Sequence, residues 1–183
     1  MGLEPETVHI HQEIIEKCRQ GDRGAHYQLY RLYSRNMYNI GYRIVNNEAE
    51  AEDVLQEAFI NAFHSLNHYR GDATFGSWLK RIVVNKAISV LKSRKMESLL
   101  ENENFDIPEE QETQVEFKFS VEQVKKAIVM LPDGYRSVLS LYLLEGYDHS
   151  EIAEILGISE STSKSQFNRS KKKLREILEG GKP

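Results

Sequence analysis

Cysteine, proline and glycine are all scarce in this sequence of 183 residues, which contains 1 cysteine, 4 prolines and 11 glycines. The single cysteine, Cys18, excludes an intrachain disulfide, which fits a reducing cytoplasm. Its place on an apolar helical stripe predicts a buried thiol. The alternation of apolar and polar residues typical of strands is missing too. The apolar content of 40% is nevertheless enough for a packed core. Together these features predict an all-α protein.

Long apolar runs are also absent. No stretch approaches 18 consecutive apolar residues, and the N-terminus has no charged segment followed by an apolar one. We therefore expect a soluble, cytoplasmic protein that does not insert into a membrane.

Charge is distributed unevenly along the chain. The formal net charge is -4, but residues 96–118 alone hold eight acidic side chains and one lysine. Between Lys164 and Arg175 there are six basic residues and no acidic one. The mean charge therefore conceals an acidic segment and a basic face.

Helical periodicity defines two blocks of sequence. In the first block, the longest expected helix runs from Arg23 to Val45, and one face of it carries Ala25, Leu29, Leu32, Met37, Ile40 and Ile44. A further helix is expected from Phe75 to Lys95. The pattern then dissolves and returns near Val121. We predict two small helical domains, residues 1–95 and 119–183, joined by a flexible acidic linker at 96–118.

The stretch "EIAEILGISESTSKSQFNRSKKKL", from Glu151 to Leu174, predicts a helix-turn-helix. Asp148 and Glu151 have the spacing of a capping box, so a short helix should begin at His149 and stop at Gly157. Ser159 is the expected N-cap of a second helix.

That second helix is nearly empty of large apolar residues. A narrow face, made of Ser163, Phe167, Ser170 and Leu174, is expected to be buried. The opposite face carries hydrogen-bonding and cationic groups suited to base edges and phosphates: Ser161, Thr162, Lys164, Ser165, Asn168, Arg169, Lys171 and Lys172. A solvated surface helix is the alternative, but the capped helix and the glycine turn before it favour insertion into the DNA major groove.

Two segments resemble one known family. "LPDGYRSVLSLYLLEGYDHSEIAEILGISESTSKSQFNRSKKKLREIL" resembles region 4 of bacterial sigma factors of the sigma-70 family, extracytoplasmic-function (ECF) subgroup. "EAEDVLQEAFINAFHSLNHYRGDATFGSWLKRIVVNKAISVLKSRK" resembles their region 2. The resemblance covers roughly residues 20–95 and 120–178 in the family's order. It implies a non-enzymatic protein that binds core RNA polymerase and directs transcription initiation at promoter DNA.

The resemblance also implies where each region acts. Region 2 would dock on the coiled coil of the beta-prime clamp and open the minus-10 element, whereas region 4 would dock on the beta flap and read the minus-35 element. Carried over by position, the polymerase-binding residues are Asp53, Gln56 and Glu57, whose spacing puts them on one helix face. A solvated acidic face is the alternative reading of these three residues.

The loop "NHYRGDATF" and the helix after it are the candidates for the minus-10 element, because a flipped base needs aromatic or polar groups that replace its lost stacking. The candidates are Tyr69, Arg70, Phe75, Lys80, Asn85 and Lys86. Trp78 shares its periodicity with Leu79 and Ile82, so we expect it in the core.

Region 4 departs from the family pattern at three positions. Many relatives have glycine and an aliphatic residue where this chain has Ser161 and Ser163, and often arginine where it has Gln166. Ser163 removes an apolar core contact, which predicts a looser seat for the helix. Gln166 and Asn168 can favour adenine through bidentate hydrogen bonds, so the minus-35 preference can differ from the commonest one.

Other functions are less consistent with the sequence. A stand-alone helix-turn-helix regulator would have no use for the region 2 match. A metal-dependent nuclease built on the acidic cluster from Glu48 to Glu57, or a metal site at Asp53, Glu57 and His64, lacks a histidine pair with ligand spacing. We expect no catalytic residue, cofactor or metal. The resemblance implies one further partner, an anti-sigma factor.

Overall fold

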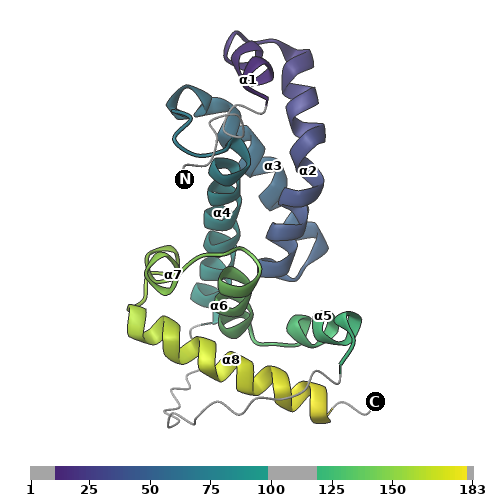
Figure 1. Ribbon diagram of the computed structural model, residues 1–183, viewed down its shortest axis with the longest axis vertical. Helices are drawn as coiled ribbons and strands as arrows, with labels where there is room; N and C mark the ends of the chain where they lie inside the picture. Colours follow the sequence, from purple (N-terminus) through teal and green to yellow (C-terminus); the bar gives the residue numbers. More distant parts are fainter. Residues whose placement is uncertain (1–10, 99–118, 181–183) are drawn as a thin grey trace, which may run out of the picture. The chain divides into compact units, whose positions relative to one another are not determined.

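The computed structural model describes residues 11–98 and 119–180, and throughout these two stretches the regular elements are helices (Figure 1). The all-α prediction is therefore confirmed. The helices are α1 (Gln12–Arg19), α2 (Arg23–Val45), α3 (Glu48–His64), the short 3-10 helix η2 (Leu66–His68), α4 (Phe75–Ser98), α5 (Val121–Val129), α6 (Asp133–Leu143), α7 (His149–Leu156) and α8 (Glu160–Gly180).

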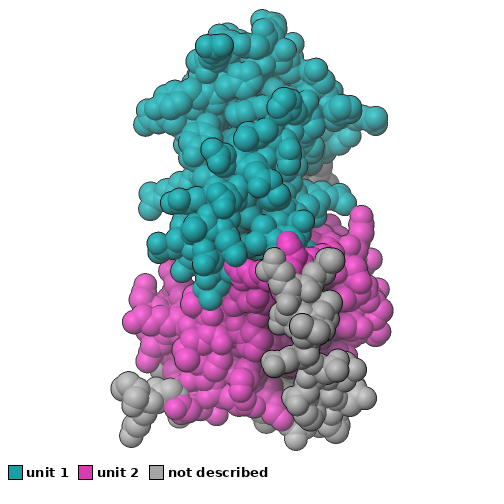
Figure 2. Space-filling view, turned by 180° about the vertical axis from the view of Figure 1, so that it is seen from behind, with its two compact units in different colours: residues 1–90 teal, residues 91–183 magenta. Residues whose placement is uncertain are grey.

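The chain forms two compact units, residues 1–90 and 91–183, which Figure 2 distinguishes by colour. The division falls inside α4, which continues to Ser98 rather than ending at Lys95 as the sequence predicts. Most of the predicted acidic linker, residues 99–118, lies outside the described residues. The linker and its boundaries therefore stay predictions.

In the N-terminal unit, α2 and α3 form a helical hairpin with a two-residue connection. Asn46 takes the left-handed conformation with a φ of 53°, which asparagine tolerates better than most residues. The side chain of Asn47 then accepts a hydrogen bond from the Glu50 amide (3.0 Å) and caps α3. The hairpin and α4 contribute a continuous apolar core: Leu29, Met37, Ile40, Ile44, Val54, Ala58, Ala62, Leu79, Val83 and Ala87.

The prediction is wrong for one residue on the expected core face of α2. Leu32 is 48% exposed, whereas Leu29 and Met37 are buried. At about 100° per residue, Leu32 lies roughly 140° from Met37 around the helix axis, at the margin of the buried arc. The regular spacing of apolar residues did not reveal how wide that arc is.

The last residue of α1 anchors the loop before α4. The Arg19 guanidinium donates hydrogen bonds to the carbonyl oxygens of Tyr69 (2.5 Å) and Leu66 (3.4 and 3.5 Å). The Tyr69 hydroxyl donates in turn to the carbonyl oxygen of Ala73 (2.7 Å). The loop is thus held at both ends by side chains that are themselves fixed on the helical core.

In the C-terminal unit, α5, α6 and α7 all contact α8 (Figure 1). Capping boxes start two of these helices, Ser120 with Gln123 at α5 and Asp148 with Glu151 at α7. Both satisfy backbone amides that would otherwise lack partners at a helix start. The buried apolar residues of this unit are Ala127, Leu131, Val138, Leu139, Leu141 and Ile152.

The predicted burial of the thiol is confirmed, because Cys18 is 3% exposed. Burial, with a smaller effect of Asp22, raises the pKa of Cys18 from 9.0 to about 11. The neutral thiol is therefore favoured in the folded protein, while the unfolded chain loses this proton near pH 9.

We expect two consequences of this shift. At pH 8 iodoacetamide should alkylate Cys18 far more slowly in the native protein than in urea. Between pH 9 and pH 11 the unfolded state loses the proton first, so the free energy of unfolding should fall as pH rises, by up to about 2 kcal/mol more than in a Cys18→Ala variant. Native labelling as fast as in urea would contradict the buried position.

Candidate nucleic-acid and partner interfaces

The helix-turn-helix has the boundaries that the sequence predicts. Helix α7 begins after the Asp148 cap and ends at Gly157, which has a φ of 72° in the left-handed region that glycine adopts without steric cost. The amides of Gly157 and Ile158 both donate to the carbonyl oxygen of Ala153, at 2.9 and 3.0 Å. This pattern closes the end of α7 and directs the chain into α8.

Ser159 caps α8 as predicted. Its hydroxyl oxygen accepts a hydrogen bond from the Thr162 amide (3.0 Å), and it also shares hydrogen bonds with the hydroxyls of Ser161 (2.8 Å) and Thr162 (2.7 Å). Ser161 and Thr162 therefore belong to a hydroxyl cluster at the helix start, besides being candidate DNA contacts.

The two faces of α8 differ as the sequence predicts. Ser163 and Ser170 are fully buried, and Phe167 and Leu174 are half-buried on the same face. All eight candidate DNA contacts lie on the rest of the helix surface. Exposed are Ser161, Lys164, Ser165, Asn168 and Lys172, and half-buried are Thr162, Arg169 and Lys171.

Two of the cations on α8 have neighbours that fix their side chains. Lys164 pairs with Glu160 at 2.7 Å, and the hydrogen bond and charge of Glu160 raise the pKa of Lys164. The Lys171 ammonium lies 5.0 Å from the centre of the Phe167 ring, a cation–π contact. Both side chains therefore have a partner on α8 itself, one turn before them.

Ser163 makes a contact in the seat of α8 that the sequence does not predict. Ser163 was expected to remove a contact and loosen the helix, but its hydroxyl oxygen lies 3.0 Å from Nδ1 of His149 on α7 and shares a hydrogen bond with it. A polar contact thus replaces the missing apolar one.

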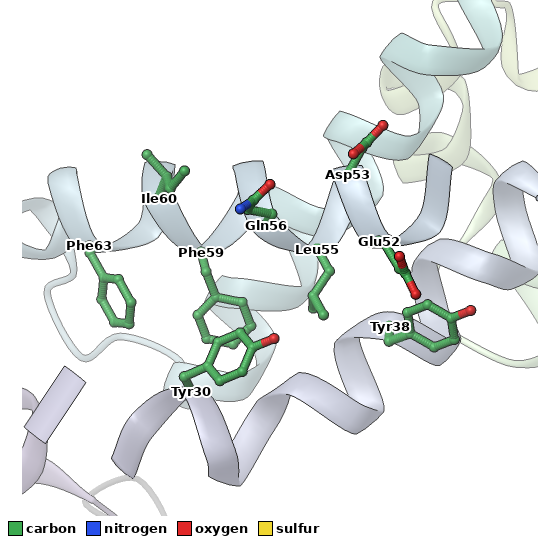
Figure 3. A pocket seen from close by; sticks show the side chains of 9 residues that line it. All are labelled: Tyr30, Tyr38, Glu52, Asp53, Leu55, Gln56, Phe59, Ile60 and Phe63. Carbon is green, nitrogen blue, oxygen red and sulfur yellow. The ribbon is translucent and has the colours of Figure 1, made fainter. Parts of the chain in front are cut away.

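A groove between α2 and α3 holds two of the three predicted polymerase-binding residues (Figure 3). The open groove has a volume of about 680 Å³, and Asp53 and Gln56 line it. Its other lining residues are Tyr30 and Tyr38 from α2, and Glu52, Leu55, Phe59, Ile60 and Phe63 from α3.

The groove is acidic at one end and aromatic at the other. Glu52 lies near Tyr38, Asp53 projects from the other side of α3 at the same end, and Phe63, Phe59 and Tyr30 line the opposite end (Figure 3). Partial burial, together with Glu48 and Glu52, raises the pKa of Tyr38, as expected near negative charge. The arrangement suits a partner helix that presents cations beside apolar side chains.

Sequence reasoning missed the aromatic half of this groove. Tyr30 lies on α2 and its ring packs 4.8 Å from that of Phe59, centre to centre, so the pairing depends on the tertiary fold. Ile60 could have been found from the sequence, because it stands one helical turn after Gln56 and therefore on the same face of α3. In the structure it is 49% exposed.

Glu57 does not line the groove. Its carboxylate forms an ion pair with the Lys86 ammonium of α4, so the structure joins a residue predicted to bind polymerase to one predicted to bind the minus-10 element. Both side chains are partly exposed.

The candidate minus-10 residues separate into buried and accessible groups. Tyr69 and Phe75 are 4% and 1% exposed, because their rings pack against each other (5.6 Å) and against half-buried Trp78 (5.4 and 5.5 Å). The two loop aromatics therefore support the loop from inside rather than present a surface to a base. Trp78 lies in this cluster, in line with its apolar periodicity.

Arg70 and Asn85 are exposed, and Lys80 and Lys86 are half-buried. At about 100° per residue, Lys80, Asn85 and Lys86 point in three different directions around α4. The structure therefore does not gather them on a single face.

Neither a metal site nor a membrane span is found among residues 11–98 and 119–180. No group of three or more His, Cys, Asp or Glu side chains there is placed to hold a metal ion. None of the helices described in these stretches is both long and apolar enough to cross a membrane.

Comparison with known protein families gave two matches. Residues 29–96 match the model of sigma-70 region 2, and residues 121–174 match that of sigma-70 region 4.

Among curated proteins, the chain is similar to the ECF RNA polymerase sigma factor SigW of Bacillus subtilis strain 168, with 30% identity over 179 residues, 90% of this chain and 94% of that protein. It is also similar to the ECF RNA polymerase sigma-E factor of Escherichia coli K12, with 30% identity over 178 residues, 89% of this chain and 91% of that protein.

Solved structures share the fold. CnrH, in complex with the cytosolic domain of CnrY, gives a TM-score of 0.55 at 22% identity, covering 92% of this chain and 97% of that one. The sigma factor RpoE of Bartonella quintana, in complex with the anti-sigma factor NepR, gives 0.56 at 21% identity, covering 85% and 98%.

The N-cap residue of α8, Ser159, allows a local test of how the start of this candidate DNA-binding helix is held. In Ser159→Ala the Thr162 amide loses its acceptor, so its hydrogen exchange should be about fivefold faster or more, while Ser159→Asp should retain protection. Ser165→Ala, an exposed serine on the same helix, is the control and should leave that exchange unchanged. Equal protection in Ser159→Ala and the native chain would show that the cap does not hold the helix start.

Proposed function

Because the chain belongs to the sigma-70 family and its ECF subgroup, we propose that it acts as a sigma factor, a non-enzymatic subunit that binds core RNA polymerase and directs initiation at specific promoters. One observation carries the proposal: region 2 and region 4 match in family order within one chain, and each match falls on its own group of helices. Such a protein would work in the cytoplasm, where the polymerase transcribes.

In this proposal α8 enters the major groove at the minus-35 element. Support comes from its narrow buried face, which leaves hydrogen-bonding and cationic groups on the remaining surface. Asn168 and Ser165 would contact base edges, whereas Gln166 is half-buried and its side chain lies beside Gly134 of α6. Phosphates would be held chiefly by the cations Lys164, Arg169, Lys171 and Lys172, and Ser161 and Thr162 would contribute at the helix start.

The groove between α2 and α3 would receive the coiled coil of the beta-prime clamp. Asp53 and Gln56 would meet cationic or polar groups of that coiled coil, and Tyr30, Phe59 and Ile60 would meet its apolar side chains. Glu57 would lie at the rim of this surface, since it is paired with Lys86.

The minus-10 element would be met by Arg70 together with side chains on one side of α4, for which Lys80, Asn85 and Lys86 are the candidates. Tyr69 and Phe75 would act indirectly, because they are buried and shape the loop that carries Arg70. An anti-sigma factor is the further partner we propose, in keeping with the RpoE and CnrH complexes, which each hold a second protein.

Run-off transcription tests the proposal. The full chain is mixed with purified core RNA polymerase and a library of promoter fragments, and the starts are sequenced. We expect discrete start sites that require both core and chain. A chain that fails to bind core and instead binds duplex DNA tightly by itself would be a stand-alone regulator.

The groove makes a specific prediction about two carboxylates four residues apart on α3. Asp53→Asn should weaken binding to core polymerase by about tenfold or more, because Asp53 lines the groove, whereas a rim charge contributes little. Glu57→Gln should weaken it by less than about threefold. Competition of each variant against labelled native chain for core polymerase measures both values. Equal losses at the two positions would contradict the assignment of the groove.

Helix α8 makes a second prediction, in which base reading and phosphate binding separate. Asn168→Ala should change the preferred minus-35 bases, because an asparagine amide can discriminate adenine. Lys164→Gln should keep the preference but lower the salt slope of holoenzyme binding by about one. Footprints over minus-35 variants at several salt concentrations measure both effects. An unchanged base preference in Asn168→Ala would remove this residue from the reading face.

A further inference from the structure

The contact between His149 and Ser163 joins the two helices of the helix-turn-helix. His149 is the first residue of α7, and Ser163 lies on the buried face of α8. Nδ1 of His149 and Oγ of Ser163 are 3.0 Å apart, and the imidazole tautomer decides which atom donates. Ser163 is 0% exposed, so water does not compete for its hydroxyl.

Aromatic contacts hold the imidazole in place. The His149 ring stacks on the Tyr142 ring, with centres 4.6 Å apart and planes 17° from parallel. The edge of the imidazole meets the Phe167 ring at 5.5 Å, and Tyr142 and Phe167 contact each other at 4.5 Å. Residues of α6, α7 and α8 thus form one cluster around half-buried His149.

The hydrogen bond between His149 and Ser163 is directional, whereas an aliphatic contact at this place would not be. Close-packed apolar side chains already restrict how α8 can turn, but the hydrophobic driving force behind them has no direction of its own. A hydrogen bond is limited to about 2.7–3.2 Å and a narrow range of angles. The pair therefore adds a directional restraint on the rotation of α8 about its own axis.

That rotation matters because the candidate DNA contacts follow Ser163 directly on α8. Polar groups at the helix surface lie about 5–6 Å from its axis, so a rotation of about 20° moves them by about 2 Å. Such a movement exceeds the tolerance of about 0.5 Å within which a binding group must be held.

We propose that His149 and Ser163 are a positioning pair that fixes the orientation of α8 and thereby sets the base preference at the minus-35 element. Neither residue contacts DNA in this account; both act through Asn168 and its neighbours. The inference rests on the proposed function. It is specific to this chain because the residue at position 163 is a serine.

Two substitutions of Ser163 that are nearly isosteric with each other test the pair. Ser163→Thr keeps the hydroxyl, whereas Ser163→Val replaces it with a methyl group of similar size. Both should fold, and urea denaturation verifies this. The ¹⁵N signals of the His149 imidazole should stay close to the native ones in Ser163→Thr and shift in Ser163→Val, whatever the function of the protein.

Promoter selection then measures the role. Holoenzyme carrying each variant is given promoters with randomised minus-35 sequences. Ser163→Thr should keep the native preference, and Ser163→Val should lose about fivefold or more of the discrimination between the best sequence and its single mismatches, since misplaced side chains no longer form their base contacts. His149→Asn, whose amide can occupy the place of Nδ1, should retain more discrimination than His149→Phe.

Coupling between the two positions completes the test. The double variant His149→Phe with Ser163→Val should lose no more discrimination than either single variant, because one hydrogen bond is removed in each case. Equal preferences in Ser163→Val and Ser163→Thr, or losses that simply add, would overturn the pair while leaving the sigma-factor function intact. A native chain that starts no transcription would overturn that function, and this inference with it.

Discussion

The narrow buried face of α8 is the constraint on which the C-terminal unit depends. A helix that presents most of its surface to a ligand can be anchored only along a strip, and here that strip is Ser163, Phe167, Ser170 and Leu174. Helices α5, α6 and α7 all contact α8. Two of its residues are serines, which leave room for close approach but contribute little apolar area. Directional contacts around His149 and Phe167 therefore carry much of the orientation that a broader apolar face would otherwise supply.

The N-terminal unit differs, because it has a large apolar core. Its candidate partner surfaces lie at the edges of that core. The α2–α3 hairpin buries apolar residues on one side and leaves a groove on the other, acidic near Asp53 and aromatic near Phe63. The loop before α4 keeps its form because Arg19 holds its backbone and Tyr69 fills its interior. In a sigma factor these two surfaces would serve different partners, and the Glu57–Lys86 ion pair links the helices that carry them.

Local signals in the sequence predicted the helical fold and the buried and polar faces of α8 well. The capping residues Asp148 and Ser159 and the left-handed Gly157 define helix boundaries within a few residues, so the helix-turn-helix could be located from the amino-acid pattern alone. Contacts between distant residues could not be predicted. His149 meets Ser163 and Glu57 meets Lys86 only because helices pack at particular angles. The loop aromatics illustrate the same limit, since composition alone does not show whether Tyr69 faces a base or the core.

As a sigma factor, this chain would read promoter DNA as part of the polymerase and not by itself. Its net charge of -4 provides a weak electrostatic term for DNA binding, so most of the affinity must come from the assembly. The most direct measurement is the anisotropy of a labelled promoter duplex, titrated at physiological salt with the chain alone, with core alone and with both. The account predicts micromolar or weaker binding by the chain alone, as for non-specific contacts of about 1–100 µM, and much tighter, sequence-dependent binding only when core and chain are combined. Nanomolar, sequence-specific binding by the chain alone would contradict it.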